Sequence, residues 1–440
     1  MTYLRFILPA ALGVLIFLTP LYWDGAVTIG IGLLTGWMKG LFGAYGLHLV
    51  VLVVVVTAVM SLLGSLVRPR WITSNAVLES LFCVSGAWVF LRVCGALFGL
   101  AYLLQVGPAL LISEGVAGAV FQDIGVNVLA VYICACLLLP LLTDYGLMEF
   151  CGTLLQPVFK RVFKLPGRAA IDALASIVGA SAIGLMISIN QYERGVYTQR
   201  EASVIATNFS IVSLPFCLVI ATVAGIEAWF LPWYGVVIVA CLVTALVVPR
   251  LPPLSRKSDT YCAGTHQKPT PESSEALLGR AWVAAMGRAQ QAPGVGGFLT
   301  QGISNLAFFL FAVVGASLAM ATFASLIVFH TPIFTWLGYP LVPVLQLLGL
   351  PEAQGAATAL FSGFLDQFMP AIAAGDIDSP VTSFVLAGLS VSQLIFMSEV
   401  GVIILRSSLP LGLLDLLQIF LLRTVVLLPL LWLGALLVVG

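Results

Sequence analysis

Long apolar runs are the feature of this sequence that most restricts its fold. A helix needs about 20 apolar residues to cross a bilayer. Nine runs reach or approach that length, at residues 6–22, 45–67, 81–104, 127–142, 203–225, 233–248, 305–329, 382–404 and 411–439. Residues 51–56 contain only valine and leucine, without the alternating polarity of a membrane strand. The runs therefore predict about nine transmembrane helices.

The small number of charges excludes most other classes of protein. Hydrophobic residues make up 60% of the 440 residues and charged residues only 9%, whereas an average soluble domain has about 45–50% and about 25%. So few charges cannot cover a water-soluble surface, and a net charge of zero offers no excess of basic residues for nucleic acid. We expect an all-α polytopic protein of a lipid bilayer, with no nucleic-acid partner.

The positive charges predict an orientation, because Lys and Arg favour cytoplasmic loops. They gather at 68–70, at 160–168 and in the polar linker 251–296, whereas the loops 105–126 and 225–232 contain none. We therefore expect a bacterial inner-membrane protein with a cytoplasmic N-terminus. No small-residue cleavage site follows the first run, so we expect a retained span and not a signal peptide.

Three apolar segments lie between Arg168 and Arg250, which are both expected to be cytoplasmic. A chain that returns to the same side needs an even number of crossings. Segment 169–189 is expected not to cross, because glycine and small residues at 179–184 permit a sharp turn at membrane depth. We interpret it as a re-entrant hairpin, with a glycine-rich packing span as the alternative.

The same order of segments occurs twice in the chain. A shift of 184 positions places Gly179 on Gly363 and Asn208 on Ser392, and it predicts a second re-entrant hairpin at 352–374. Residue identity between the two units is low, so the order of elements is their main support. The expected parts are N-terminal scaffold spans at 1–126, a first unit at 127–250, a linker at 251–296 and a second unit at 297–440.

The charges predict that one unit is inverted relative to the other. Residues 144–165 contain Lys160, Arg161 and Lys164, whereas the matching stretch 332–350 contains no Lys or Arg. Inverted repeats with broken helices are typical of secondary transporters, where they support alternating access to a central site.

Four short motifs carry a family resemblance. They are Leu165-Pro-Gly-Arg168, Gly179-Ala-Ser-Ala-Ile-Gly184, Arg200-Glu-Ala202 and Thr207-Asn-Phe-Ser210. From about residue 81 to the end, the chain resembles the nucleoside-recognition or Gate family, and most closely its YjiH-type membrane proteins. It is more distantly similar to the Gate units of concentrative nucleoside transporters and ferrous-iron transporters. The resemblance implies re-entrant hairpins around a central substrate site, with an elevator-like movement, but it names no substrate.

Two departures from the iron transporters lower the expectation of iron as substrate. The sequence contains no Gly-x-x-x-x-Gly-Lys-Ser/Thr phosphate loop, so energisation by a GTP-binding domain of that kind is not expected. The segment around Gly179 has Ser181 and lacks the cysteine of the iron transporters' gate motif.

Polar side chains inside membrane segments are candidate site residues, because each costs stability unless it is paired or functional. The expected substrate-binding residues are Ser181, Asn190, Gln191, Asn208, Ser210, Ser213, Ser362, Gln367, Ser392 and Gln393. Asp366 and Glu399 are the expected ion-coupling residues, because a carboxylate at membrane depth could bind a proton or a cation.

Structural roles for the same residues stay open. A serine in a membrane helix often bonds its own backbone, and Glu399 could form an ion pair with Arg423. Asp366 could lie near the membrane surface. Pro215 and Pro370 could open the backbone or only kink it. Most of the eight cysteines lie in apolar segments and the three histidines form no cluster, so we expect no metal site and no cofactor.

We expect a secondary transporter that moves a small polar solute, such as a nucleoside, an amino acid or a dipeptide-like metabolite. It is expected to be coupled to a proton or a sodium ion, or to be facilitated. The alternatives are a non-transporting partner subunit and a polytopic membrane enzyme. No convergent catalytic group supports an enzyme, so no enzyme activity is expected. The N-terminal spans are expected to form a scaffold or a homo-oligomer contact.

Overall fold

The computed structural model describes residues 2–23, 26–178, 181–262 and 276–440. Most of this part is helical, and the one sheet it contains is an antiparallel pair that joins Pro20 to Ile29 and Trp23 to Ala26. The predicted all-α membrane fold is confirmed.

The N-terminal elements precede the two repeated units. They are α1 (Thr2–Phe17), β1 (Pro20–Trp23), β2 (Ala26–Ile29), α2 (Gly30–Phe42), η1 (Gly43–Tyr45), α3 (Gly46–Leu62), η2 (Leu63–Val67), α4 (Arg70–Thr73), α5 (Ala76–Phe82), α6 (Gly86–Leu104) and η3 (Glu114–Gly125).

The first unit and the linker follow. Their elements are α7 (Val126–Leu138), α8 (Pro140–Thr143), α9 (Leu147–Val158), η4 (Phe159–Phe163), α10 (Ala169–Val178), α11 (Ser181–Glu193), α12 (Gln199–Asn208), α13 (Leu214–Val223), η5 (Glu227–Trp229), α14 (Phe230–Val247), η6 (Val248–Arg250), η7 (Leu254–Arg256) and α15 (Leu277–Gln291).

The second unit completes the chain. Its elements are α16 (Val295–Ala307), η9 (Phe308–Val314), α17 (Gly315–His330), α18 (Ile333–Gly338), η10 (Tyr339–Leu341), α19 (Val342–Leu347), α20 (Ala353–Ser362), α21 (Phe368–Gly375), α22 (Pro380–Ser392), α23 (Val400–Arg406) and α24 (Leu413–Val438).

Six helical stretches in the described residues are long and apolar enough to cross a membrane. They are Gly30–Val67, Gly86–Leu104, Glu114–Leu138, Glu227–Arg250, Val295–His330 and Leu413–Val438. The shorter apolar helices include α1, α10, α13 and α22.

Two predicted continuous spans are broken helices, which corrects the sequence reading. Span 203–225 is divided into α12 and α13 by the non-helical residues 209–213, and span 382–404 into α22 and α23 by residues 393–399. Pro215 lies in the first turn of α13, where its missing N–H costs nothing. Pro370 lies inside α21 and does not open either break.

The two segments predicted to be hairpins each contain two short helices that pack against each other, α10 with α11 and α20 with α21. Gly184 of α11 allows the close approach in the first pair, because a Cβ there would collide with the Ser176 side chain. In the second, the Asp366 carboxylate accepts the Phe368 N–H at 2.8 Å, at the first residue of α21. Re-entry from one membrane side stays a prediction. The sharp turn expected in the first hairpin includes residues 179 and 180, which lie outside the described residues.

The same offset of 184 positions relates these elements. It carries both ends of α10 onto both ends of α20, and the last residue of α12 onto the last residue of α22. In each unit a helical hairpin precedes a broken helix, and the long helix α14 or α24 follows. The inverted orientation of the second unit stays a prediction.

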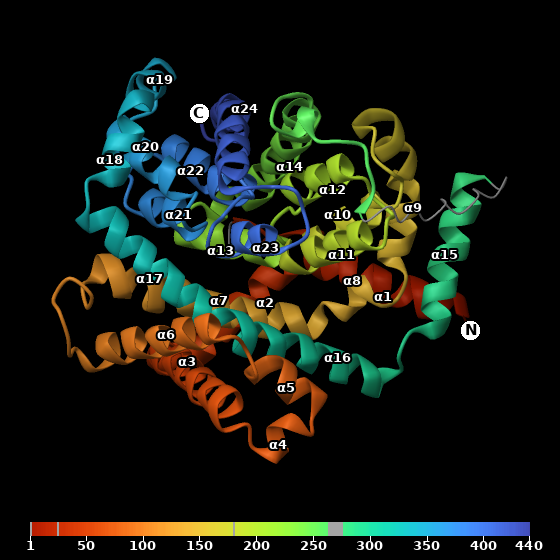
Figure 1. Cartoon of the computed structure of the whole chain (residues 1–440), viewed down its shortest axis with the longest axis horizontal. Coiled ribbons are helices and arrows are strands. Elements are labelled where there is room, and N and C mark those ends of the chain that lie inside the picture. The colour runs from red at the N-terminus through yellow and green to blue at the C-terminus, as the bar shows by residue number, and fades with distance from the viewer. Residues whose placement is uncertain (1, 24–25, 179–180, 263–275) are drawn as a thin grey trace.

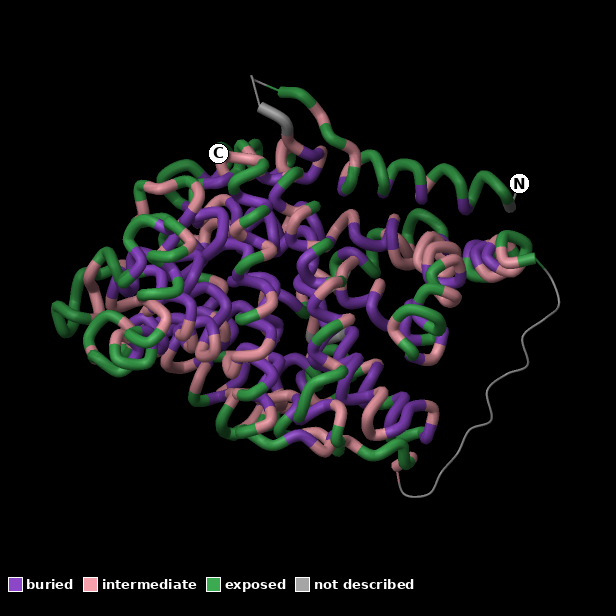
Figure 2. The backbone as a smooth tube through the Cα atoms, turned by 90° about the horizontal axis from the view of Figure 1, so that it is seen from above, coloured by how far each residue is buried: buried purple, intermediate pink, exposed green. Residues whose placement is uncertain are grey.

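The hairpins and broken helices lie together on one side of the molecule. In Figure 1, α16 and α17 run in line across it, with α3–α6 on one side and α12–α14 and α20–α24 on the other. Buried residues fill the middle (Figure 2). Residues 214–221 of α13 and 382–392 of α22 are all buried, so both breaks lie inside the protein.

Candidate functional site

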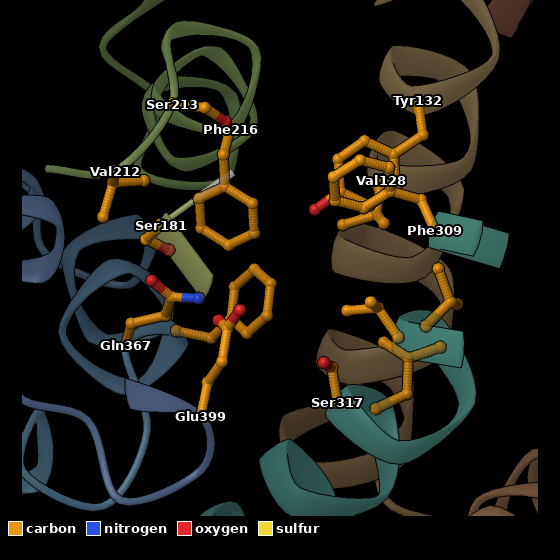
Figure 3. Close-up of a pocket in the computed structure, with 14 residues that line it drawn as sticks. Val128, Tyr132, Ser181, Val212, Ser213, Phe216, Phe309, Ser317, Gln367 and Glu399 are labelled. Carbon is orange, nitrogen blue, oxygen red and sulfur yellow. The ribbon is translucent and has the colours of Figure 1, made fainter. Parts of the chain in front are cut away.

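A pocket lies where the hairpin ends and the helix breaks meet the wall formed by α7, η9 and α17 (Figure 3). The cavity between these elements has a volume of about 40 Å³. The lining residues are Val128, Tyr132, Ser181, Val212, Ser213, Phe216, Phe309, Val313, Val314, Ser317, Leu318, Gln367, Phe368 and Glu399.

Most of the polar side chains come from the repeated units' irregular elements. Ser181 begins α11, Ser213 ends the first break, Gln367 precedes α21 and Glu399 ends the second break. In Figure 3 these four residues lie on one side of the pocket. All four are residues that the sequence marks as candidates, and the structure brings them together.

The facing wall was missed by the sequence reading. Tyr132 of α7, Phe309 of η9 and Ser317 of α17 point toward the pocket from the opposite side (Figure 3). One sequence signal could have found part of it, because the 184-residue offset carries Tyr132 to the position beside Ser317. Phe309 gave no such signal, because phenylalanine is common throughout the apolar segments of this chain.

Asn208 is held by a buried arginine behind the pocket. Arg423 of α24 donates from Nη1 to Asn208 Oδ1 at 2.7 Å and to the Thr207 carbonyl at 3.2 Å. The same guanidinium donates from Nη2 to the Ser392 carbonyl at 2.6 Å and from Nε to the Gln393 carbonyl at 3.0 Å. Arg423 therefore bonds both helix breaks, and these bonds replace the ion pair with Glu399 that we considered from the sequence.

Gln393 also points away from the pocket. Its Nε2 donates to Thr424 Oγ1 at 2.9 Å and to the Leu360 carbonyl at 3.3 Å, and it is completely buried. These bonds join the second break to α24 and to the second hairpin.

Three candidate serines bond to carbonyls in their own segment. Ser210 Oγ donates to the Ala206 carbonyl at 2.9 Å. Ser362 Oγ donates to Ala359 at 2.7 Å, and Ser392 Oγ donates to Gly388 at 2.6 Å. None of the three lines the pocket, and each makes the local bond that is common for serine in a membrane helix.

The remaining amide candidates lie on α11, away from the pocket lining. Asn190 is exposed and its Nδ2 donates to the Met186 carbonyl at 3.0 Å. Gln191 is buried but does not line the pocket.

The two carboxylates have different surroundings. Glu399 lines the pocket, whereas Asp366 is buried behind it and accepts the Phe368 N–H. The second break is hydrogen-bonded to the hairpin beside it, because the Met397 N–H donates to the Phe364 carbonyl at 2.9 Å and the Ser398 N–H donates to the Leu365 carbonyl at 3.0 Å.

Across the described part of the chain, no group of three His, Cys, Asp or Glu side chains is arranged to hold a metal ion.

The Arg423 contacts predict that Asn208 contributes to stability more than its exposed counterpart Asn190. Asn208→Ala leaves a buried guanidinium N–H without one of its acceptors, which costs about 2 kcal/mol. We expect a clear drop in the melting temperature of the purified protein, measured in detergent by intrinsic fluorescence. Asn190→Ala is the matched control and should change it little. Equal melting temperatures for the two variants would contradict the structural assignment of Asn208.

Comparisons with known proteins agree with the Gate resemblance. A family model described as nucleoside recognition, Gate, matches residues 126–227. An uncharacterized protein of Alkalihalophilus pseudofirmus is 42% identical over 428 residues, which are 97% of this chain and 92% of that protein.

Solved structures of CNTnw, a concentrative nucleoside transporter, are also similar. A variant in an intermediate state has a TM-score of 0.38 at 14% identity, covering 100% of this chain and 92% of that chain. A second variant in an outward-facing state has a TM-score of 0.37 at 14% identity, covering 98% and 97%. On the 42% identity over nearly all of both chains, this multi-pass membrane protein belongs to the same family as the Alkalihalophilus protein, and it carries a nucleoside-recognition Gate domain at residues 126–227.

Proposed function

We propose that this protein is a secondary transporter for nucleosides and that the pocket of Figure 3 is its substrate site. The observation that carries this proposal is the composition of the pocket. Aromatic rings, uncharged hydrogen-bonding groups and the Glu399 carboxylate surround it, and the Gate domain supplies part of its lining. Hairpins and broken helices on one side, with a continuous helical wall on the other, suit a site that opens alternately.

The side chains that line the pocket match the chemical groups of a flat base joined to a sugar. Phe216, Phe309 and Phe368 offer ring faces for stacking on a base. Gln367 carries both a donor and an acceptor for a base edge. Glu399 and the serine hydroxyls can bond the hydroxyl groups of a ribose.

Amino acids and dipeptides fit this lining less well. Their carboxylate group needs a cation or a set of free N–H donors, and the described pocket lining includes no Lys or Arg. A neutral solute with several hydroxyl groups avoids that requirement. The pocket therefore favours a nucleoside among the solutes that the sequence suggested.

Uptake into proteoliposomes tests this function. The purified full-length protein should take up radiolabelled uridine or adenosine, and alanine or dialanine much less. Base stacking on an aromatic ring is worth about 1–3 kcal/mol, so Phe309→Ala should raise KM for the nucleoside by roughly tenfold. Its neighbour Phe308 is 42% exposed and does not line the pocket, so Phe308→Ala should leave KM within about twofold. Uptake of dipeptides without nucleosides would reject the proposal.

We further propose that Glu399 couples uptake to a proton gradient, with Asp366 as a supporting carboxylate. Glu399 is the one charged side chain in the described pocket lining, so its protonation changes the charge that a substrate meets. Glu399→Gln keeps the size of the side chain but not its titration. We expect this variant to equilibrate nucleoside across the membrane without concentrating it, while inserting normally.

Asp378→Asn is the matched control for Glu399→Gln, because Asp378 is an exposed carboxylate outside the pocket. It should accumulate nucleoside as the wild type does when an inward proton gradient is applied. Gradient-driven accumulation by Glu399→Gln at the wild-type level would remove Glu399 from the coupling step.

The charge pattern supports an inner-membrane protein with Lys160 on the cytoplasmic side and Asp376 outside. Single cysteines introduced as Lys160→Cys and Asp376→Cys, in a chain without its native cysteines, test this orientation. A membrane-impermeant maleimide should label the second in intact cells and the first only after lysis. Labelling of both from outside would contradict the inverted repeat.

A further inference from the structure

We propose that Arg423 is a built-in cation which takes the place of a coupling sodium ion at the junction of the two helix breaks. This inference rests on the proposed function, because the pocket must bind a solute before its cation requirement can be measured. It goes beyond that function by assigning a role to a residue outside the pocket.

The two helix breaks create a site that attracts a cation. The last carbonyls of α12 and α22 have no partner further along their own helix, because the helices stop at Asn208 and Ser392. Each helix C-terminus also carries roughly half an elementary negative charge from its aligned peptide dipoles. Two such helix ends that meet at one point supply about one elementary negative charge, which can balance one cation.

Arg423 occupies this point. It is completely buried, and its three nitrogens donate to the carbonyls of Thr207, Ser392 and Gln393 and to the amide oxygen of Asn208. In the part of the chain that the structure describes, no carboxylate forms an ion pair with it. The Cys241 side chain of α14 is a further partner of the guanidinium, and its other polar contacts are backbone carbonyls of both repeated units and the Asn208 amide.

This coordination resembles that of a transported cation. In transporters with discontinuous helices, unwound carbonyls and the C-terminal ends of half-helices coordinate the coupling sodium ion or proton. Here the same kinds of oxygen atom bind a guanidinium that is covalently attached to α24. Because the side chain cannot leave, the cation is present in every transport state.

The junction is linked to the pocket by the two breaks themselves. Residues 209–213 lead from the Arg423 contacts to Ser213, and residues 393–399 lead to Glu399, and both of these side chains line the pocket. Arg423 is thus a positioning residue. It sets the ends of the segments that meet the substrate, and solute binding should not need sodium at this junction.

Binding measurements on the full-length protein in NaCl and in choline chloride test this assignment. For the wild type, the Kd for uridine, measured by isothermal titration calorimetry, should agree within about twofold between the two salts. Arg423→Ala should bind at least tenfold more weakly in choline, and should recover at least threefold when 150 mM NaCl or 20 mM guanidinium chloride is supplied. Arg423→Lys keeps a fixed positive charge but loses the planar set of N–H donors of the guanidinium. This variant should therefore bind uridine more weakly without gaining a sodium dependence.

Trp233→Phe is the matched control. Trp233 is also buried and also donates to a backbone carbonyl, that of Phe384, at 3.2 Å, but it lies on α14 outside the pocket lining. Its loss should lower the melting temperature and leave the Kd within about twofold. This control separates a general loss of stability from the loss of a positioned junction.

Three results would overturn the proposal. They are a sodium requirement in the wild type, wild-type affinity in Arg423→Ala, or a folded Arg423→Ala protein that gains nothing from either cation. If the alanine variant does not fold, the same binding measurements on the wild type and on Arg423→Lys test the proposal. A sodium requirement for uridine binding in either protein overturns the proposal.

A wild type that binds no nucleoside rejects the proposed function but leaves the junction testable. The melting temperature of Arg423→Ala should then rise by at least 3 °C in 20 mM guanidinium chloride relative to choline chloride, with no rise in the wild type. Absence of that rise would reject the built-in cation separately.

Discussion

The arrangement of both repeated units depends on the hydrogen bonds of one buried guanidinium. Arg423 joins the ends of α12 and α22, which belong to segments far apart in the chain. Ending a helix inside an apolar core leaves carbonyl groups that water cannot reach, and each would cost free energy if it stayed unpaired. A planar group with five N–H donors can satisfy several carbonyls at once, which a lysine ammonium does less well. The cost of burying the arginine is offset by the same contacts.

The contacts of Arg423 with the ends of α12 and α22 allow the residues after these ends to line the pocket. Because each helix stops in the core, the following residues can present Ser213 and Glu399 to a shared space. The hairpin ends add Ser181 and Gln367 from the same side (Figure 3). Continuous helices would direct these groups into helix–helix contacts. The polar side of the pocket is thus a consequence of interrupted secondary structure, whereas Tyr132 and Phe309 come from the helical wall of α7, η9 and α17.

Local sequence patterns predicted the hairpins better than the helix breaks. Small residues at 179–184 and the offset to 352–374 indicated where short helices would pair. The breaks at 209–213 and 393–399 were read as parts of continuous spans, because hydropathy depends on side-chain composition and these residues are largely apolar. Proline was not a reliable guide, since Pro215 supports the start of α13 and Pro370 lies within α21.

Composition and the lengths of the apolar runs were sufficient for the membrane class and the all-α fold, because these properties depend on stretches of one helix or less. The partners of individual polar side chains depend on packing between stretches. Asn208 and Arg423 are 215 positions apart, and only the folded chain brings them within 2.7 Å. The same packing turned Gln367 and Glu399 toward the pocket and Gln393 away from it. The sequence could identify these polar residues as costly at membrane depth. Only the tertiary structure decided which of them bond to a neighbouring side chain or carbonyl and which of them face the pocket, where a ligand can bind.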